Sequence, residues 1–370
     1  MRMNLGKIGT QEAANLIALT LAVTGIFTVD SAVAYENGNS TFLSIPLSLL
    51  IVFGLFMLVM YAMRISEAES FSQMLDIAVG KTAGKVLMFI VVAALLFNAY
   101  LLLLRFISMI HSYVFVEASY LNVAVWVLIP VLCIALLGLE TIGRMAKIFA
   151  VALGFLFLLG FVSAIDGFET YRLYPLFGDG VYKIGEYTLE STYKFIPAFI
   201  APLTMIKGMN GIATVKKSTI IAACVAVVLC FITQLVLGLT YEYNSLKNMY
   251  FPLCRLNMSL QNEDYFMRTD KIGIFLWLSG AVITVAYYIY SAGYVFCKRT
   301  KTLDIRPCIV CFTILVSSFV LIEYTDLYEI VHTVTEAVER YSFIVLLAIV
   351  TVGAIGSMIK SKGKTKNETN

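Results

Sequence analysis

The chain has 370 residues, of which 60% are hydrophobic and only 14% are charged, and its mean hydropathy is +0.86. A soluble domain carries about 25% charged and 45–50% apolar residues, so a water-soluble core could not hide this many apolar side chains. The composition excludes a soluble protein and predicts a polytopic membrane protein, whereas the net charge of +3 says little by itself.

Segments long enough to cross a membrane recur along the chain, since a helix needs about 20 apolar residues to span the hydrocarbon layer. The first of them is not a removable signal peptide, because no small-residue cleavage site follows and the apolar run continues. Residues 361–370 are predicted to form a disordered, basic cytoplasmic tail. The rest, residues 1–360, is predicted to be one transmembrane domain with ten spans at about 12–33, 43–63, 86–110, 120–138, 145–165, 187–206, 218–240, 271–296, 306–323 and 341–359.

The positions of the charges predict the orientation of the spans. Most of the 27 lysines and arginines lie in the segments on the N-terminal side of the predicted bundle, and the last segment on the opposite side, 323–340, is acidic. Lysine and arginine collect on the cytoplasmic side of membrane proteins. Both termini are therefore expected in the cytoplasm, in agreement with an even number of spans.

Two connecting segments predict short helices outside the spans. The segment 66–85 has the pattern of an amphipathic helix on the cytoplasmic surface, with Phe71, Leu75 and residues 77–79 turned toward the bilayer. The segment 241–270 alternates apolar and polar residues and predicts short helices over the outer mouth of the bundle.

The first and sixth spans contain residues that interrupt helices. Pro197 and Pro202 fall in the sixth span, and each removes a backbone donor and clashes with the preceding turn. In the first span, Thr24 precedes Gly25, which loosens the helix. Interrupted helices at matching positions of two five-span halves are typical of inverted-repeat transporters with a binding site at the midplane. An unrelated ten-helix bundle is the alternative.

Helices that break at mid-depth expose free peptide groups, of which the N–H groups attract a carboxylate and the carbonyls an ammonium. A small zwitterion such as an amino acid offers both groups. Two helix faces, in the third and eighth spans, are expected to border the same cavity, although ordinary aromatic packing explains the tyrosines equally well. These faces consist of Leu95, Asn98, Ala99 and Leu102, and of Thr284, Tyr287, Tyr288 and Ser291.

Three charged residues fall inside the predicted spans, where each requires a partner or access to water. Arg105 is expected to pair with a carboxylate such as Asp30. Asp30 itself either binds a cation or proton or lies in water at the outer end of its span. Lys194 either takes part in binding or extends toward the outer surface.

No motif for catalysis, metal or cofactor binding, or nucleic-acid recognition is present. His111 and His332 lie near the outer edge without metal-ligand spacing. The pair Cys308-x-x-Cys311 lacks a second pair or a nearby histidine, so two small helix residues are the simpler interpretation. We therefore expect no enzyme activity, no cofactor and no metal site.

Several segments resemble the B-subunit family of spore germination receptors, the GerAB-type proteins of the amino acid–polyamine–organocation superfamily. They are 138–149 (GLETIGRMAKIF), 174–184 (YPLFGDGVYKI) and 251–278. The glycine and glutamate that the family commonly places at the break of the sixth span are absent here, which bears on the ligand or on a cation or proton role. The other positions that match the family's pattern are Phe251-Pro252-Leu253, Arg268, Asp270, Trp277, Thr24-Gly25-Ile26 and Arg105.

The resemblance implies an all-α, ten-span LeuT-type fold with a 5+5 inverted repeat and broken helices 1 and 6, in the inner membrane of a spore. It also implies a subunit that senses a nutrient, often an amino acid, beside an A subunit and a lipoprotein C subunit. The candidate substrate-binding residues, from the resemblance and the helix faces together, are Thr24, Gly25, Ile26, Asn98, Ala99, Pro197, Phe199, Thr284 and Tyr288.

Three functions are compatible with these features. The first is a germinant-sensing receptor subunit, which depends on partner subunits. The second is an autonomous amino acid permease of the same superfamily, which would take up solute without partners. The third is a signalling or scaffold membrane protein with a vestigial cavity.

Overall fold

The computed structural model describes residues 6–27, 40–178, 180–247, 249, 251–259, 269–322 and 328–368, and every regular element in these ranges is a helix. The short helices are α4 (Phe71–Val79), η2 (Ile165–Gly167), η3 (Thr170–Leu173), α10 (Tyr243–Lys247) and α11 (Pro252–Ser259). A long helix occupies each range in which the sequence predicts a span. These are α1 (Thr10–Phe27), α3 (Thr41–Ile65), α5 (Lys81–Tyr113), α6 (Tyr120–Leu137), α7 (Leu139–Ala164), α8 (Val181–Thr204), α9 (Ile212–Thr240), α12 (Thr269–Thr300), α13 (Arg306–Ile322) and α14 (Tyr328–Glu368).

The helices differ in how far they face the surroundings. Within the described residues, α3, α5, α6, α7, α9, α12 and α14 are long and apolar enough to cross a membrane, and α13 is a shorter apolar helix. Helices α1 and α8 are instead enclosed by other helices, since nearly every side chain over 13–24 and 191–204 is buried. A helix that faces protein rather than lipid can carry polar residues and prolines. Helix α1 carries threonines, and α8 carries threonines, a serine and two prolines.

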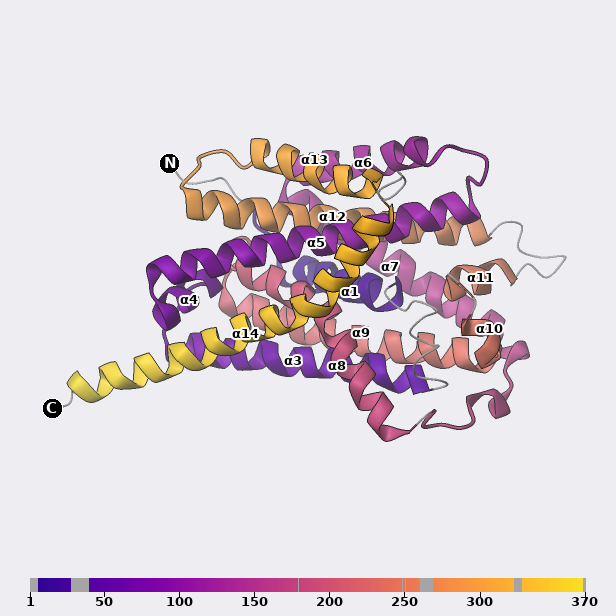
Figure 1. Ribbon diagram of the computed structural model, residues 1–370, viewed down its shortest axis with the longest axis horizontal. Helices are drawn as coiled ribbons and strands as arrows, with labels where there is room; N and C mark the ends of the chain where they lie inside the picture. Colours follow the sequence, from indigo (N-terminus) through magenta and orange to yellow (C-terminus); the bar gives the residue numbers. More distant parts are fainter. Residues whose placement is uncertain are drawn as a thin grey trace.

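The enclosed helices occupy the middle of the bundle. Figure 1 shows α1 near the centre, with α5, α7 and α9 around it. Helix α1 packs most extensively on α9 and also contacts α7, α8 and α12, while α8 packs mainly on α3. Helix α12, the most buried of the apolar helices, lies along α5. A side-chain bond supports the α3–α8 contact, because the Ser48 hydroxyl donates to the Thr188 carbonyl at 2.8 Å.

One end of the bundle, here called the N-terminal side, is held together by contacts between segments far apart in sequence. The backbone of Ile8 donates to the Gly208 carbonyl at 3.0 Å and accepts from the Asn210 amide at 3.0 Å. These contacts join the segment before α1 to the turns between α8 and α9. Other links on this side are Lys207–Glu69, Arg299–Asp76 and Ser361 to the Ile65 carbonyl.

Helix α4 forms within the predicted amphipathic segment, but the prediction that its apolar face meets the bilayer is wrong. Phe71, Met74 and Leu75 are fully buried and face α14 and α5. The two guanidinium nitrogens of Arg299 each donate to a different Asp76 carboxylate oxygen at 2.9 Å, which fixes α4 to the end of α12. An amphipathic pattern indicates that one face is buried but does not tell lipid from protein.

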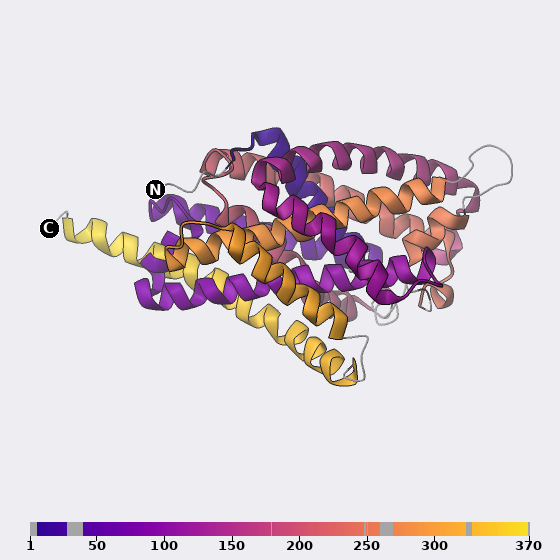
Figure 2. The same cartoon turned by 90° about the horizontal axis from the view of Figure 1, so that it is seen from above.

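The C-terminal segment also differs from its prediction. Helix α14 continues through the basic residues to Glu368, where the sequence predicted a disordered tail from residue 361. The Ser361 hydroxyl donates to the Ile65 carbonyl at 2.9 Å, so the first residue of the predicted tail is attached to α3. Both Figure 1 and Figure 2 show the last part of α14 extending beyond the other helices.

The opposite end of the bundle is covered by the short helices. The Glu169 amide donates to the Leu239 carbonyl at 3.1 Å, so the η2–η3 segment lies against the end of α9. Leu253 and Leu256 of α11 are buried. The prediction of short helices over this mouth is confirmed for α10 and α11, and residues 260–268 lie outside the described part of the chain.

The predicted interruption of the sixth span at Pro197 does not occur. Helix α8 runs without a break through Pro197 and Pro202 and ends at Thr204, where the Met205 amide donates to the Pro202 carbonyl at 3.2 Å and a series of turns begins. Helix α1 likewise continues through Gly25 to Phe27, and residues 28–39 are outside the described range. Burial against α3 and α1 holds α8 helical although each proline removes one backbone bond.

Gly25 allows close helix packing rather than a break. A Cβ atom added at Gly25 would lie 2.6 Å from the Cys230 sulfur and 3.2 Å from the Phe195 ring. Three helices, α1, α8 and α9, therefore meet at this glycine. Small residues at such crossings let membrane helices approach each other closely.

Replacing Gly25 with alanine is expected to lower the thermal stability of the purified protein by about 1–3 kcal/mol, since the new methyl group overlaps the Cys230 sulfur. Adding Cys230→Ala should recover part of this loss, which a double-mutant cycle measures. Gly154→Ala is the matched control, because no atom lies within 4 Å of the added Cβ. Equal stability of Gly25→Ala and the unmodified chain would contradict the packing role.

Asp76→Asn is expected to destabilise the protein by about 2 kcal/mol, because Arg299 would keep its partly buried position without a counter-charge. Glu140→Gln should change stability by less than about 1 kcal/mol, since its pair with Arg144 is exposed. Thermal unfolding of both variants in the same detergent makes the comparison. An equal effect of the two substitutions would refute the anchoring of α4 by Arg299.

Candidate binding site

A chain of hydroxyl groups runs across the centre of the bundle from α12 to α1. The rings of Tyr287 and Tyr288 are stacked, with centroids 6.3 Å apart and planes inclined by 21°. The Tyr288 hydroxyl lies next to that of Thr24 on α1, and the Tyr287 hydroxyl lies next to that of Ser291, one turn along α12. These four residues, Thr24, Tyr287, Tyr288 and Ser291, are called the central hydroxyl cluster.

The cluster is fully enclosed, and its three α12 hydroxyls lack complete hydrogen bonds. All of its members are at most 1% exposed. The hydroxyl oxygens of Tyr287, Tyr288 and Ser291 are near their neighbours without completing a hydrogen bond of good geometry within the described residues. Each buried hydroxyl without a partner destabilises a folded protein by about 1–3 kcal/mol. Such groups in native structures call for an explanation, of which a bound polar ligand or water is the simplest.

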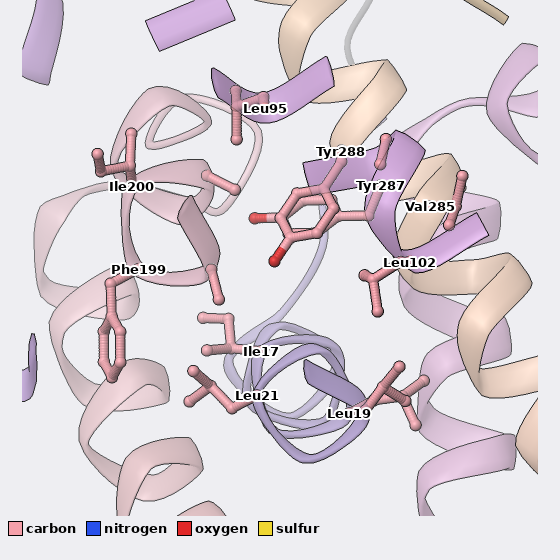
Figure 3. Packing of buried hydrophobic residues seen from close by; sticks show 14 of the residues in the cluster. Ile17, Leu19, Leu21, Leu95, Leu102, Phe199, Ile200, Val285, Tyr287 and Tyr288 are labelled. Carbon is pink, nitrogen blue, oxygen red and sulfur yellow. The ribbon is translucent and has the colours of Figure 1, made fainter. Parts of the chain in front are cut away.

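The walls around the cluster are apolar. Figure 3 shows the two tyrosine hydroxyls directed toward α8 and α1, where Ile200 and Ile17 lie, and away from their own helix. Leu95 and Leu102 of α5 flank the tyrosines in the same view. Hydroxyl groups within apolar walls can orient a small polar molecule, because the few polar groups of such a site fix its position.

Helix α8 contributes hydrogen-bond acceptors to the interior. Pro197 and Pro202 cannot donate to the carbonyls four residues earlier, so the carbonyls of Tyr193 and Ala198 lose their helical donor. Both residues are buried. A continuous proline-containing helix therefore frees carbonyl groups, as the predicted break would have done, and carbonyl oxygens suit an ammonium or hydroxyl group.

The structure brings only some of the predicted site residues together. Thr24 and Tyr288 lie together in the cluster. Asn98 and Thr284 are buried, but their side-chain donors bond to carbonyls of their own helices, at Ala94 and at Gly280. Of these four residues, only Thr24 and Tyr288 meet through side-chain hydroxyls of different helices.

The other predicted residues are enclosed without offering side-chain donors. Ala99 and Pro197 are buried in α5 and α8, and the side chain of Ile26 lies outside the described part. The Phe199 ring packs on Phe53 and Phe56 of α3, at centroid distances of 6.5 and 5.8 Å. Figure 3 shows this ring turned away from the two tyrosines, so the structure directs it toward α3.

Tyr287 and Ser291 complete the cluster, although they are not among the predicted substrate-binding residues. Both belong to the α12 face that helical spacing predicted, so the signal for them was present in the sequence. No sequence pattern predicted that Cys230 and Phe195 pack against Gly25, because these residues lie on three different helices that meet only in the folded protein.

The charged residues of the spans lie apart from the cluster or beyond the described residues. Arg105 is half-buried and has an interaction partner, and its predicted partner Asp30 lies outside the described range. The Lys194 ammonium lies 5.8 Å from the centroid of the Tyr193 ring. His111 contacts the Ala118 carbonyl at 3.1 Å.

Metal chemistry finds no support among the described residues, which contain no group of three histidine, cysteine or acidic side chains able to hold an ion. The enclosed polar cluster and the ring of apolar helices are those of a multi-pass membrane protein with a candidate binding site at its centre. Catalytic side chains are not part of this arrangement.

Comparison with solved structures defines the class of protein. A Na⁺-coupled sialic acid symporter in a substrate-bound outward-open state matches with a TM-score of 0.68 and 10% identity, over 96% of this chain and 89% of that chain. Mhp1, a nucleobase-cation-symport-1 family transporter in a closed conformation with bromovinylhydantoin bound, matches with a TM-score of 0.64 and 10% identity, over 97% and 92%. The predicted LeuT-type transporter fold is thereby confirmed.

Comparison with family models then gives the family. The model described as spore germination protein, Spore_permease, matches residues 7–329. The chain therefore belongs to the spore germination protein family, as the resemblance in its sequence indicated. No curated protein matches the chain. Family and fold neighbours are permease-like proteins or transporters rather than enzymes.

Tyr288→Phe is expected to leave the ligand-free protein as stable as the unmodified chain, or more stable, because it removes a buried hydroxyl that lacks a complete hydrogen bond. A structural hydroxyl would behave in the opposite way, with a loss of about 1 kcal/mol. Thermal unfolding without added ligand distinguishes the two. Tyr182→Phe, at an exposed position of α8, serves as the neutral control.

Proposed function

We propose that this chain is the nutrient-sensing membrane subunit of a spore germination receptor, and that it binds a small zwitterion, an amino acid, at the central hydroxyl cluster. The family match and the transporter fold support a membrane protein that senses or moves a nutrient. The observation that carries the site is the set of three buried α12 hydroxyls, of Tyr287, Tyr288 and Ser291, that lack complete hydrogen bonds.

The chemistry of the site supports an uncharged or zwitterionic ligand. Tyr287, Tyr288 and Ser291 can donate to a carboxylate, and the carbonyls released by Pro197 and Pro202 can accept from an ammonium. In this proposal Thr24 and Tyr288 contact the ligand, while Gly25, Asn98, Ala99, Pro197 and Thr284 shape the cavity around it.

We further propose that all ten long helices cross the inner membrane of a spore with both termini in the cytoplasm. The prevalence of lysine and arginine in the segments of the N-terminal side supports this orientation. The contacts among these segments support their placement on one side of the membrane. Partner A and C subunits of the receptor are part of the proposal.

An autonomous amino acid permease is the alternative, and the similarity to symporters in overall fold favours it. The two functions differ in their need for partners. A permease moves solute through vesicles that contain this chain alone, whereas a receptor subunit acts with other subunits and need not move solute.

Spores that lack this chain, complemented with variants, test the proposal. Tyr288→Phe is expected to raise the nutrient concentration for half-maximal germination about tenfold, since one lost hydrogen bond of about 1.4 kcal/mol corresponds to that factor. Tyr182→Phe should leave the response unchanged. Immunoblots of spore membranes ensure equal amounts of each variant.

An unchanged dose response of Tyr288→Phe at equal protein amount would refute the site. Uptake of labelled amino acid by vesicles that contain only this chain, lost in Tyr288→Phe, would instead establish the permease. Germination that continues after Gly25→Leu disrupts the contact of α1 with α8 and α9, in protein that still reaches the membrane, would favour a scaffold.

A further inference from the structure

The end of α12 and the start of α13 bring two cysteines together on the N-terminal side. The sulfur atoms of Cys297 and Cys308 are 3.2 Å apart. The motif Cys308-x-x-Cys311, interpreted from the sequence as two small helix residues, is a different pair, and Cys311 is exposed on the surface of α13. Because a disulfide requires a sulfur–sulfur distance of about 2.05 Å, a shift of roughly 1 Å would suffice to join Cys297 to Cys308.

The connection between the two helices fixes this arrangement. Helix α12 ends with Lys301 in the left-handed conformation at φ 62°, and the Thr302 amide donates to the Cys297 carbonyl at 3.0 Å. This is the hydrogen-bond pattern of a Schellman motif, which ends a helix at a defined residue. The Asp304 carboxylate accepts from the Arg306 amide at 3.0 Å and caps the first turn of α13.

Packing between the helices adds to this geometry. The Cys297 thiol also points to the Asp304 carbonyl at 3.6 Å. A Cβ at Gly293 would lie 3.4 Å from Ile305 and 3.5 Å from Ile309, so the connection lies close against α12 one turn before Cys297. Two capped helix ends and this close packing therefore hold the thiols opposite each other.

The two thiols differ in access. Cys297 is fully buried, whereas Cys308 is partly exposed. A small reagent can reach Cys308 first, and the buried Cys297 is then placed to complete the reaction. An accessible cysteine with a second cysteine beside it is the arrangement found in thiols that undergo reversible oxidation.

We propose that Cys297 and Cys308 form a reversible disulfide site that joins the end of α12 to the start of α13. The oxidant is a low-molecular-weight disulfide. Cys308 attacks it as the thiolate, forms a mixed disulfide and releases one small thiol. Cys297 then loses its proton, attacks the Cys308 sulfur and releases the second small thiol. Two protein thiols are oxidised and one small disulfide is reduced to two thiols.

The disulfide would act on the helix that carries the central hydroxyl cluster. Ser291 and Cys297 are six residues apart in α12, which corresponds to about 9 Å along a helix. A covalent link at Cys297 restrains the end of this helix against α13. The site itself requires only the two helix ends and stands independently of the ligand.

The purified full-length chain in detergent, treated with hydroxyethyl disulfide and then alkylated and digested, tests the proposal by mass spectrometry. The expected main product is a peptide pair linked through Cys297 and Cys308, which dithiothreitol separates. Cys311→Ser should give the same product. Cys297→Ser should instead accumulate the mixed disulfide at Cys308, because the resolving thiol is absent.

A Cys308–Cys311 link as the main product would overturn the proposal, since the motif rather than the helix junction would then determine the pairing. A mixed disulfide that persists at Cys308 in the unmodified chain would also overturn it, as would the absence of any reaction. A thermal-unfolding profile recorded before oxidation ensures that each variant is folded.

Discussion

The need to satisfy polar groups without water governs this structure. In a membrane, a backbone or side-chain polar group that finds no partner within the protein finds none in the lipid. The threonine and serine hydroxyls of the helices mostly solve this problem locally, as Thr284 does by donating to Gly280 and Thr20 by donating to Leu16. Against this background the central hydroxyl cluster brings three incompletely bonded hydroxyls together in one place.

The packing of α1 and α8 creates this situation. Nearly all side chains over 13–24 of α1 and 191–204 of α8 are buried, so most polar residues in these stretches face the interior rather than lipid. Gly25 lets α1 approach α8 and α9 closely, and the Ser48 hydroxyl bonds α3 to α8. The outer helices supply the apolar surface that the membrane requires. Helix α1 can therefore carry hydroxyls, and α8 can carry both hydroxyls and prolines, in the interior. The contacts on the N-terminal side then hold the ends of these helices together.

Much of this architecture could be predicted from the sequence, because hydrophobic runs determine the long helices locally. A long helix occupies each predicted range, and the predicted LeuT-type fold is confirmed. Whether each helix is continuous, and whether it faces lipid or protein, could not be predicted, because both depend on the neighbouring helices. Pro197 indicated a break that packing suppresses, and Phe71 indicated a lipid face that α14 covers. For the same reason the pairing of Cys308 with Cys297 appears only in three dimensions.

The candidate site, too, could be predicted only in part from the sequence. Helical spacing placed Tyr287, Tyr288 and Ser291 on one face, but their meeting with Thr24 requires the crossing of α12 and α1. The most direct test is a structure of the chain in lipid with its nutrient bound. The account predicts ligand density within hydrogen-bond distance of the Tyr287 and Tyr288 hydroxyls, between α1, α8 and α12. Ligand density elsewhere, with these hydroxyls bonded to one another, would contradict it.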